Sequence, residues 1–271
     1  RDLTLASTRL FEDLAAIEGL DFGFEEKGAL YAFRTQEGLE SAISEVRHLW
    51  DLGIQASVLT PDEMEPLNPG LQMRVEGGVF YPQDCHLNPA RFVRQLAEYL
   101  TQKGALILPD TEVLALETSG DRITAVITTR GDFVPEQIVL AGGSWSPQIA
   151  SSLGMNLPIQ PAKGYSITVK RPDPAPTVPT MLAESKVAVT PLGDLLRFAG
   201  TLELAGLDLS VNMRRVKAIL RTIPVYLPQM DPDSLDLIEI WCGPRPCTPD
   251  GLPFLGRTHK NLVVAAGHAM I

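Results

Sequence analysis

The stretch Ile240-Trp241-Cys242-Gly243-Pro244-Arg245-Pro246-Cys247-Thr248-Pro249-Asp250-Gly251-Leu252-Pro253-Phe254-Leu255-Gly256-Arg257 is the most informative part of this 271-residue chain. The apolar residues at its start predict a strand that enters a segment rich in glycine and proline. Such a segment is neither a helix nor a central strand, because proline lacks the N–H and glycine adds backbone entropy. Arg245 stands between two prolines, which suits two parallel hydrogen bonds to a carboxylate. The alternative is an arginine that bridges surface loops.

The composition is that of an ordinary soluble globular protein, with 45% hydrophobic and 21% charged residues. The net charge of -10 argues against nucleic acid as a partner, because phosphate binding needs a clustered positive face. No apolar run approaches the ~20 residues of a membrane span, and no signal peptide opens the chain. We predict a cytoplasmic location, with peripheral association at the inner membrane face as an alternative.

The three cysteines, Cys85, Cys242 and Cys247, form no even disulfide framework and match no zinc spacing. They favour a reducing compartment. Asp84-Cys85-His86 contains metal-binding residue types, but no partner cluster follows, so we predict no metal site.

Periodicity and turn residues predict a mixed α+β or α/β fold. Expected helices are 3–17, a helix carrying Leu39 to Trp50, a short helix after a capping box at Thr60, 88–100, a helix after Gly143, and 210–223. Expected strands are a hairpin over 22–33, then 54–59, 77–81, 105–108, 112–117, 123–129, 133–141, 161–169, 186–190, 195–204 and the strand into the arginine motif.

A strand, a glycine pair and a predicted serine N-cap follow one another in Ile138-Val139-Leu140-Ala141-Gly142-Gly143-Ser144-Trp145-Ser146-Pro147. In α/β proteins, a strand–Gly-Gly–helix corner brings backbone N–H groups close to a phosphate or a ring. The alternative is an α/β turn that binds no ligand.

The chain contains no Gly-x-Gly-x-x-Gly sequence, with which a dinucleotide-binding fold normally begins. It opens inside an amphipathic helix and closes directly after a strand. We therefore expect an internal part of a longer protein.

The pattern Gly-x-Arg-Pro-x-Thr-Pro-Asp-Gly-x-Pro-x-x-Gly, followed by Asn261-Leu262-Val263-Val264-Ala265-Ala266-Gly267-His268, resembles the FAD-dependent D-amino acid dehydrogenase and glycine oxidase (DAO) family. Further matching segments are Gly77–Leu100, Val139–Pro147, Pro161–Gly164 and Phe198–Glu203. The resemblance covers essentially the whole chain. Compared with the family pattern, the N-terminal phosphate-binding unit and the C-terminal helix are lacking.

The resemblance implies an antiparallel-sheet substrate domain joined to an incomplete, Rossmann-like FAD-binding domain. It assigns 1–20, 85–156 and 244–271 to the FAD domain, and 21–84 and 157–243 to the substrate domain. We expect the substrate segments to form one antiparallel sheet with helices on one face.

Site roles also follow from the resemblance. Arg245 would bind the substrate carboxylate and His268 would lie near the flavin as a second catalytic candidate. The FAD candidates are Val113, whose backbone would meet the adenine, with Ala141, Gly142, Gly143, Trp145 and Gly267. Lys163-Gly164 would mark the strand that returns towards the substrate side of the flavin. Simpler interpretations are a buried strand valine for Val113, core packing for Trp145 and a helix cap for His268.

The implied activity is oxidation of D-amino acids, glycine or secondary amines to imino acids by hydride transfer to FAD. The substrate would be a small amino acid, and the electron acceptor oxygen or a quinone. Alternatives are a non-catalytic binding module of the same fold and a flavin dehydrogenase for hydroxy acids or glycerol phosphate. The Arg-Pro-x-Thr-Pro-Asp-Gly spelling favours amino acids. Because the phosphate-binding unit is lacking, we expect this part alone to be colourless and inactive.

Overall fold

The computed structural model describes residues 2–269, so the outermost residues of the predicted segments 1–20 and 244–271 lie outside it. The chain divides into two compact units that interleave along the sequence. Unit 1 contains residues 2–103, Tyr165–Thr201 and Val211–Cys242. Unit 2 contains Gly104–Gly164, Leu202–Ser210 and residues 243–269.

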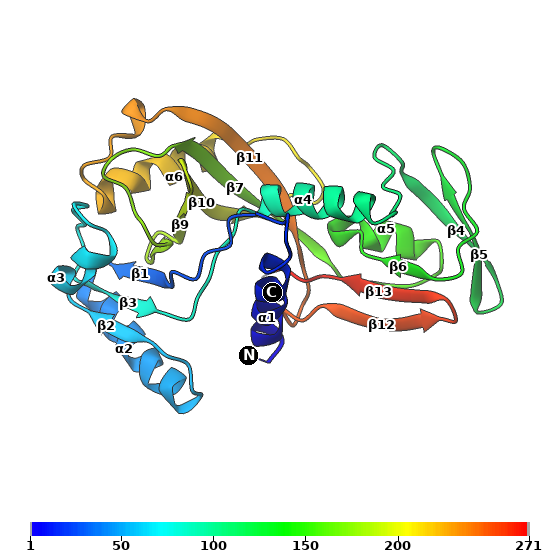
Figure 1. Ribbon diagram of the computed structural model, residues 1–271, viewed down its shortest axis with the longest axis horizontal. Helices are drawn as coiled ribbons and strands as arrows, with labels where there is room; N and C mark the ends of the chain where they lie inside the picture. Colours follow the sequence, from blue (N-terminus) through cyan, green and yellow to red (C-terminus); the bar gives the residue numbers. More distant parts are fainter. Residues whose placement is uncertain (1, 270–271) are drawn as a thin grey trace. The chain divides into compact units, whose positions relative to one another are not determined.

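An eight-stranded sheet organises unit 1, in the order β11-β7-β10-β9-β8-β1-β3-β2 (Figure 1). Its strands are β1 (Ala29–Phe33), β2 (Ser57–Leu59), β3 (Gly77–Tyr81), β7 (Gln160–Lys170), β8 (Thr180–Leu182), β9 (Val187–Leu192), β10 (Leu195–Glu203) and β11 (Leu237–Cys247). β3 pairs antiparallel with β1 and β2, and β9 with β8 and β10, whereas β1 and β8 are parallel. The prediction that segments far apart in the sequence form one sheet is confirmed, but the sheet is mixed and not wholly antiparallel, because β1 and β8 run parallel.

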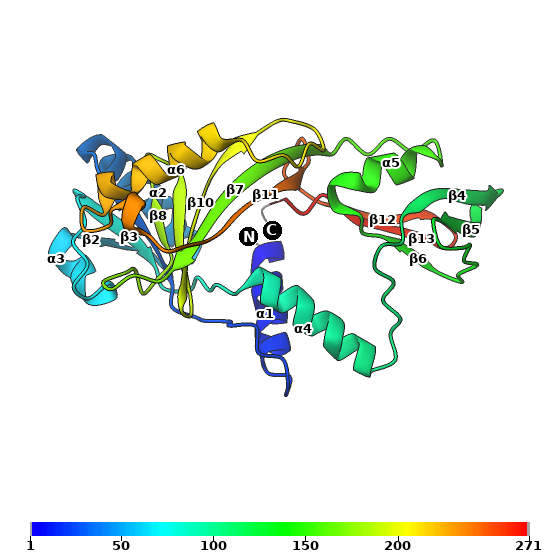
Figure 2. The same cartoon turned by 90° about the horizontal axis from the view of Figure 1, so that it is seen from above.

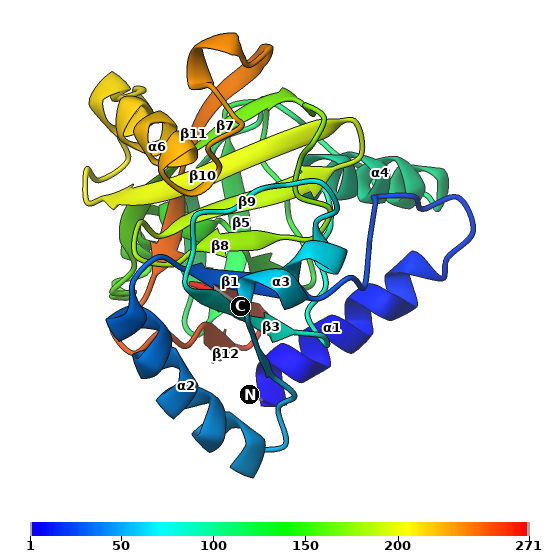
Figure 3. The same ribbon diagram turned by 90° about the vertical axis from the view of Figure 1, so that its left-hand side faces the viewer.

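Helices cover both faces of this sheet, which corrects the prediction of helices on one face. α6 (Met213–Tyr226) buries Val216, Ile219 and Ile223 in a cluster that includes Leu182 of β8. In the neighbouring strand β1, Ala32 is the parallel partner of Leu182, so the two side chains lie on the same face of the sheet. Phe33 follows Ala32 and therefore points to the opposite face. Phe33 packs with α2 (Gln36–Asp51). Figure 3 shows α6 and α2 at different places on the sheet.

Two helices of unit 1 lie outside this sheet, α1 (Asp2–Ala15) and α4 (Pro89–Gln102). They meet through Phe11 and Phe92, whose ring centroids are 5.3 Å apart, and Phe22 packs on Phe92 at 4.9 Å. By contacts, residues 2–20 and 85–103 therefore group with unit 1. Their assignment to the FAD domain stays a prediction.

Local signals gave several elements correctly. Thr60 and Glu63 form the predicted capping box at the start of α3 (Pro61–Met64), which continues into η1 (Glu65–Leu67).

The bounds of the predicted helix 210–223 were wrong. The helix begins at Met213, after an Asn212 cap, and runs through Pro224 to Tyr226. Tyr226 is 1% exposed, so burial of its ring outweighs the hydrogen bond lost at Pro224.

Three strand predictions were wrong in part. The hairpin over 22–33 does not form, because the backbone of Glu25 pairs with His86 through bonds of 2.8 and 2.9 Å. Residues 105–108 form no strand. Of 133–141, only β6 (Ile138–Leu140) is a strand, while Phe133 bridges to Val126.

Unit 2 contains a three-stranded sheet in the order β12-β13-β6 and a separate β4-β5 pair (Figure 2). The remaining elements are β4 (Val113–Ser119), β5 (Arg122–Thr128), η2 (Gly143–Trp145), α5 (Ser146–Ser151), β12 (Phe254–His259) and β13 (Leu262–Ala266), with η3 (Pro232–Ser234) in unit 1. One apolar cluster joins elements of unit 2, with Ile123, Ala150 and Leu262 among its buried members.

Asn261 holds β5 to the start of β13. It is fully buried, its Nδ2 donates to the carbonyl of Ile123 at 2.9 Å, and its Oδ1 accepts from the N–H of Ile123 at 2.9 Å. Both backbone groups of Ile123 therefore depend on one side chain.

We expect Asn261→Ala to destabilise the protein strongly, because each buried backbone group left unpaired costs about 1–3 kcal/mol. Urea unfolding monitored by circular dichroism measures the change. The matched control is Asn156→Ala at an exposed position, which should leave the unfolding midpoint nearly unchanged. Equal midpoints for both variants would contradict this role of Asn261.

Candidate active site

Two strand ends define an edge of the three-stranded sheet. β13 is parallel to β6, with Leu262 opposite Ile138 and Val264 opposite Leu140. Their carboxyl ends therefore meet at one edge, where β6 runs into the 141–145 corner and β13 into Gly267-His268. Ligands of α/β sheets bind at such carboxyl ends.

Ser144 links the glycine corner to the arginine motif. Its side chain is buried, and its Oγ donates to the carbonyl of Pro244 at 3.3 Å, across 100 residues of sequence. No side-chain cap is present at η2 or α5, so the predicted serine N-cap was wrong. The hydroxyl instead brings two sequence motifs together in unit 2.

Gly267 fits closely against the same motif. Its φ of +85° lies in the left-handed region, and a Cβ there would be 2.6 Å from Cγ2 of Thr248. A side chain is thus excluded by both conformation and space. This contact fixes the end of β13 beside the Thr-Pro-Asp-Gly turn.

Arg245 rests on Gly164 of the neighbouring strand. A Cβ at Gly164 would be 2.9 Å from Nη1 and 3.3 Å from Cζ of Arg245, so only glycine leaves room for the guanidinium. The side chain is half-buried, and within residues 2–269 its guanidinium has no hydrogen bond or ion pair. It therefore does not bridge loops. β11 is an edge strand, which tolerates Pro244 and Pro246.

Lys163 projects from the opposite face of β7, because successive strand residues alternate. Although 1% exposed, its Nζ donates to Asp208 Oδ2 and to the carbonyl of Ser210, each at 2.9 Å, with Glu203 Oε2 at 4.0 Å. The hydrogen bond from Lys163, joined by bonds from Ser210, holds the pKa of Asp208 well below its usual range. This pair anchors the segment 202–210 behind the strand that supports Arg245.

The remaining candidates lie at defined places in unit 2. Trp145 is 41% exposed, so it is not a core packing residue. Ala141 and His268 are exposed, and Gly143, with a φ of +54°, has open space around its Cβ position. Val113 is half-buried against the apolar cluster of unit 2, and its role towards adenine stays a prediction.

Sequence reasoning missed Thr248 and the Lys163–Asp208 pair. A single charged residue, Lys163, in the otherwise uncharged predicted strand 161–169 was a usable signal for a buried ion pair. The sequence around Asp208, 45 residues further along, gave no signal that this residue pairs with Lys163.

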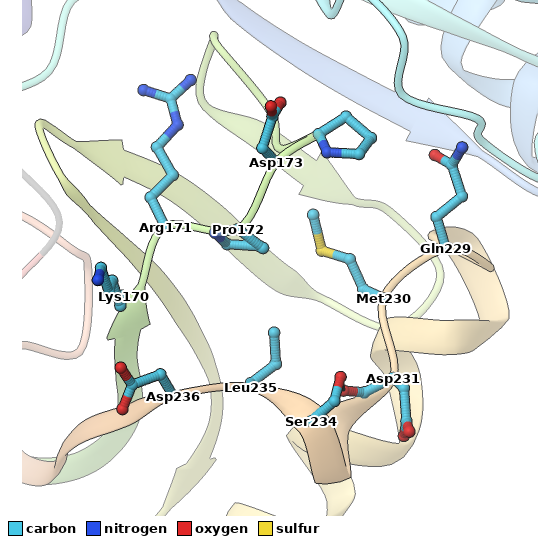
Figure 4. Close-up of a pocket in the computed structure, with 11 residues that line it drawn as sticks. Lys170, Arg171, Pro172, Asp173, Gln229, Met230, Asp231, Ser234, Leu235 and Asp236 are labelled. Carbon is cyan, nitrogen blue, oxygen red and sulfur yellow. Dashed lines mark hydrogen bonds between the residues drawn. The ribbon is translucent and has the colours of Figure 1, made fainter.

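Figure 4 shows a cavity of about 220 Å³ in unit 1, between the end of β7 and Gln229–Asp236. It contains none of the predicted site residues, and its aspartates, Asp173, Asp231 and Asp236, point in different directions. Residues 2–269 hold no group of three side chains suited to a metal ion. Over the same residues, no helix is both long and apolar enough to cross a bilayer.

Comparison with known proteins identifies the family. The model of the FAD dependent oxidoreductase (DAO) family matches residues 1–270. The chain belongs to this family. The D-amino acid dehydrogenase of Granulibacter bethesdensis is 34% identical over 96% of the chain and 63% of the relative. That of Vibrio atlanticus is 34% identical over 98% of the chain and 64% of the relative. The chain thus spans less than two thirds of the length of these curated relatives.

A solved structure has the same fold. Glycine oxidase from Geobacillus kaustophilus superposes with a TM-score of 0.85, at 27% identity, over 97% of this chain and 71% of that one. The family is FAD-dependent. The edge described above has room for a flavin, because it combines open space at Gly143 with an exposed Trp145.

We expect Gly267→Ala to destabilise this DAO-family protein more than Gly120→Ala. Both glycines have positive φ, but only Gly267 would place a Cβ against another side chain. Overpacking of this kind adds about 1–3 kcal/mol to the conformational strain. Urea unfolding of the two variants tests the difference, and equal losses would show that Thr248 does not confine Gly267.

The ion pair of Lys163 predicts a pH dependence. The pKa of Asp208 is lower in the folded state, so its stabilising contribution is present above the unfolded pKa of about 3.9 and disappears as pH falls below it. Melting temperatures of the wild type and Asp208→Asn should differ steadily from pH 8 to about 5 and converge in more acidic buffer. A gap that persists at acid pH would contradict the pairing.

Proposed function

We propose that the full-length protein oxidises D-amino acids, or glycine and secondary amines, to imino acids, with Arg245 binding the substrate carboxylate. The observation that carries this proposal is the unpaired guanidinium of Arg245 on Gly164, in the motif that Ser144 ties to the glycine corner. Relatives named D-amino acid dehydrogenase and a structural neighbour named glycine oxidase support it.

When bound, FAD supplies the chemistry by accepting a hydride from the substrate α-carbon. The protein's part is to orient the substrate. The planar guanidinium of Arg245 can give two parallel hydrogen bonds to the substrate carboxylate, which fixes the position of the α-carbon. Gly164 leaves room for this guanidinium, and Lys163 with Asp208 fixes β7 from the other face.

The cofactor-binding residues in this proposal are Val113, Ala141, Gly142, Gly143, Trp145 and Gly267, with His268 near the flavin ring. The open space around Gly143 and the exposure of Trp145 support this assignment. The segments 1–20, 85–156 and 244–271 then belong to the FAD domain, and 21–84 and 157–243 to the substrate domain.

For the electron acceptor we propose oxygen or a quinone, and with a quinone a peripheral location at the inner membrane face. Relatives carry both dehydrogenase and oxidase names. Oxygen consumption during turnover, compared with reduction of a soluble quinone, separates the two acceptors.

In the full-length protein, Arg245→Lys should reduce kcat/KM on D-alanine, D-proline and glycine by some tens-fold or more. Lysine keeps the charge but loses the planar fork, and disrupting a desolvated charge pair costs about 2–5 kcal/mol. The flavin absorbance should be unchanged, since the carboxylate and the cofactor have different ligands. Steady-state kinetics and flavin spectra of each variant provide the test.

The matched control is Arg257→Lys on β12, where the guanidinium donates to Gln137 and to the carbonyl of Lys260. It should leave kcat/KM unchanged. Unchanged kinetics with Arg245→Lys would remove Arg245 from the substrate site. Oxidation of lactate or glycerol phosphate in preference to amino acids would reject the proposed substrate class.

Gly164→Ala provides a second test with the arginine intact. Its Cβ would press on Nη1 and Cζ of Arg245, and the flexible guanidinium can move aside without loss of the fold. We expect KM for the amino acid to rise several-fold while the melting temperature and flavin content stay close to wild type. A KM equal to that of the wild type would mean that the carboxylate does not depend on this position of the guanidinium.

A further inference from the structure

Helix α6 of unit 1 carries charge of one sign only, in a chain whose net charge is -10. The other long helices, α1, α2 and α4, each contain both signs. Between Asp208 and Asp231 the sequence has no acidic residue and four basic ones: Arg214, Arg215, Lys217 and Arg221. α6 is therefore a local positive region of an acidic protein.

Three of these residues form a stripe on the outward side of α6. Arg214, Lys217 and Arg221 are spaced i, i+3 and i+7, which places them on one helix face, and all three are exposed. The buried residues of the helix, such as Val216 and Ile219, lie on the opposite side and pack into the core of unit 1. Figure 2 shows α6 lying along one face of the large sheet. We call Arg214, Lys217 and Arg221 the basic stripe.

The basic stripe has no partner within the described chain. Among residues 2–269, the charged groups of its three side chains make no hydrogen bond or ion pair. The nearest acidic residues beyond the C-terminal end of α6 are Asp231 and Asp233 of η3, and Asp231 accepts from the N–H of Asp233 at 3.1 Å. The donors of the stripe are therefore available to an anion outside this unit.

The order of charges along α6 also opposes the helix dipole. The first turn, which favours negative charge, has no acidic residue and contains Arg214 and Arg215. The last turn, which favours positive charge, has no basic residue. This order destabilises the isolated helix, so helix formation does not account for it. An anionic surface next to the N-terminal half of α6 would reverse this effect.

Apolar surface adjoins the basic stripe. Val211 and Met213 are 41% and 48% exposed, and they lie on either side of the Asn212 cap, directly before Arg214. A bilayer surface matches this combination, because basic side chains bind anionic headgroups while apolar ones enter the boundary of the acyl chains. A free anion would engage the basic residues alone and leave the apolar pair in water.

The acidic remainder of the protein does not prevent such binding. The Debye length is about 8 Å at physiological ionic strength, so a bilayer interacts mainly with the charges that lie next to it. The cytoplasmic leaflet of a cell membrane is negatively charged and attracts clusters of lysine and arginine.

We propose that the basic stripe, with Val211 and Met213, docks the protein on the surface of a bilayer that contains anionic phospholipids. This inference rests on the peripheral location included in the proposed function and assigns a surface to it. Docking requires neither FAD nor substrate. A failed binding test would therefore leave the proposed oxidation of amino acids standing.

Vesicle flotation of the full-length protein measures the docking. One set of vesicles consists of phosphatidylcholine, and the other of an equimolar mixture of phosphatidylcholine and phosphatidylglycerol. We expect binding to the mixed vesicles at low salt, and release in about 1 M NaCl, where the Debye length falls to about 3 Å. Equal binding to both sets, or binding to neither, would overturn the proposal.

The triple variant Arg214→Gln, Lys217→Gln, Arg221→Gln tests the stripe itself. Each basic residue at an anionic surface strengthens binding about fivefold, so its affinity for the mixed vesicles should fall about a hundredfold. The melting temperature should stay close to that of the wild type, because the three side chains are exposed and glutamine is a good helix former. Undiminished binding would remove the stripe from the docking surface.

The matched control is the triple variant Arg9→Gln, Arg47→Gln, Arg94→Gln, which changes the net charge equally at exposed positions of α1, α2 and α4. It should bind the mixed vesicles like the wild type. Equal weakening in the two triple variants would mean that binding follows net charge and not α6.

Two further measurements separate the components of the surface. Val211→Ser with Met213→Ser should weaken binding several-fold with the stripe intact, and an unchanged affinity would exclude an apolar contribution. Sedimentation without vesicles tests a second copy of this acidic chain as the occupant. The wild type and the stripe variant should have the same oligomeric state at low salt. A salt-sensitive association that the stripe variant lacks would assign the stripe to contacts between copies and reject the bilayer.

Discussion

The parallel pairing of β13 with β6 is the constraint on which the candidate site depends. It joins strands more than a hundred residues apart and brings their carboxyl ends to one edge. Only there do the glycine corner and Gly267-His268 become neighbours in space. Ser144 and Thr248 extend this edge to the arginine motif through one hydrogen bond and one close contact. A different register would separate these groups.

The two faces of β7 make different contacts, one with Arg245 and the other with Asp208. On one face, the Arg245 guanidinium occupies the space that a side chain at position 164 would fill, and Gly164 leaves this space open. On the other, the buried ammonium of Lys163 is compensated by Asp208 and the carbonyl of Ser210. A buried cation without partners would be strongly unfavourable, so this pairing is a condition for the strand's position. The arginine stays unpaired within the described residues and keeps its donors available for a carboxylate.

Unit 1 shows that burial can override local signals. Pro224 lies inside α6 because Ile223 and Tyr226, on either side of it, are fully buried. The segment 22–33 has the composition of a hairpin, but Glu25 finds its hydrogen-bond partner at His86. In both places, contacts with distant residues outweigh a preference of the local sequence.

The sequence by itself determined the arginine motif, the glycine corner, the capping box at Thr60 and the mixed fold class, because each depends on neighbouring residues. It also led us to predict Arg245 as a carboxylate ligand, a role that stays a proposal. Only the tertiary structure decided that Gly164 lies under this guanidinium, that Ser144 bonds to Pro244 instead of capping a helix, and that Lys163 meets Asp208. The physical reason is that these contacts depend on strand order and register, which bring together residues 45 to 100 positions apart.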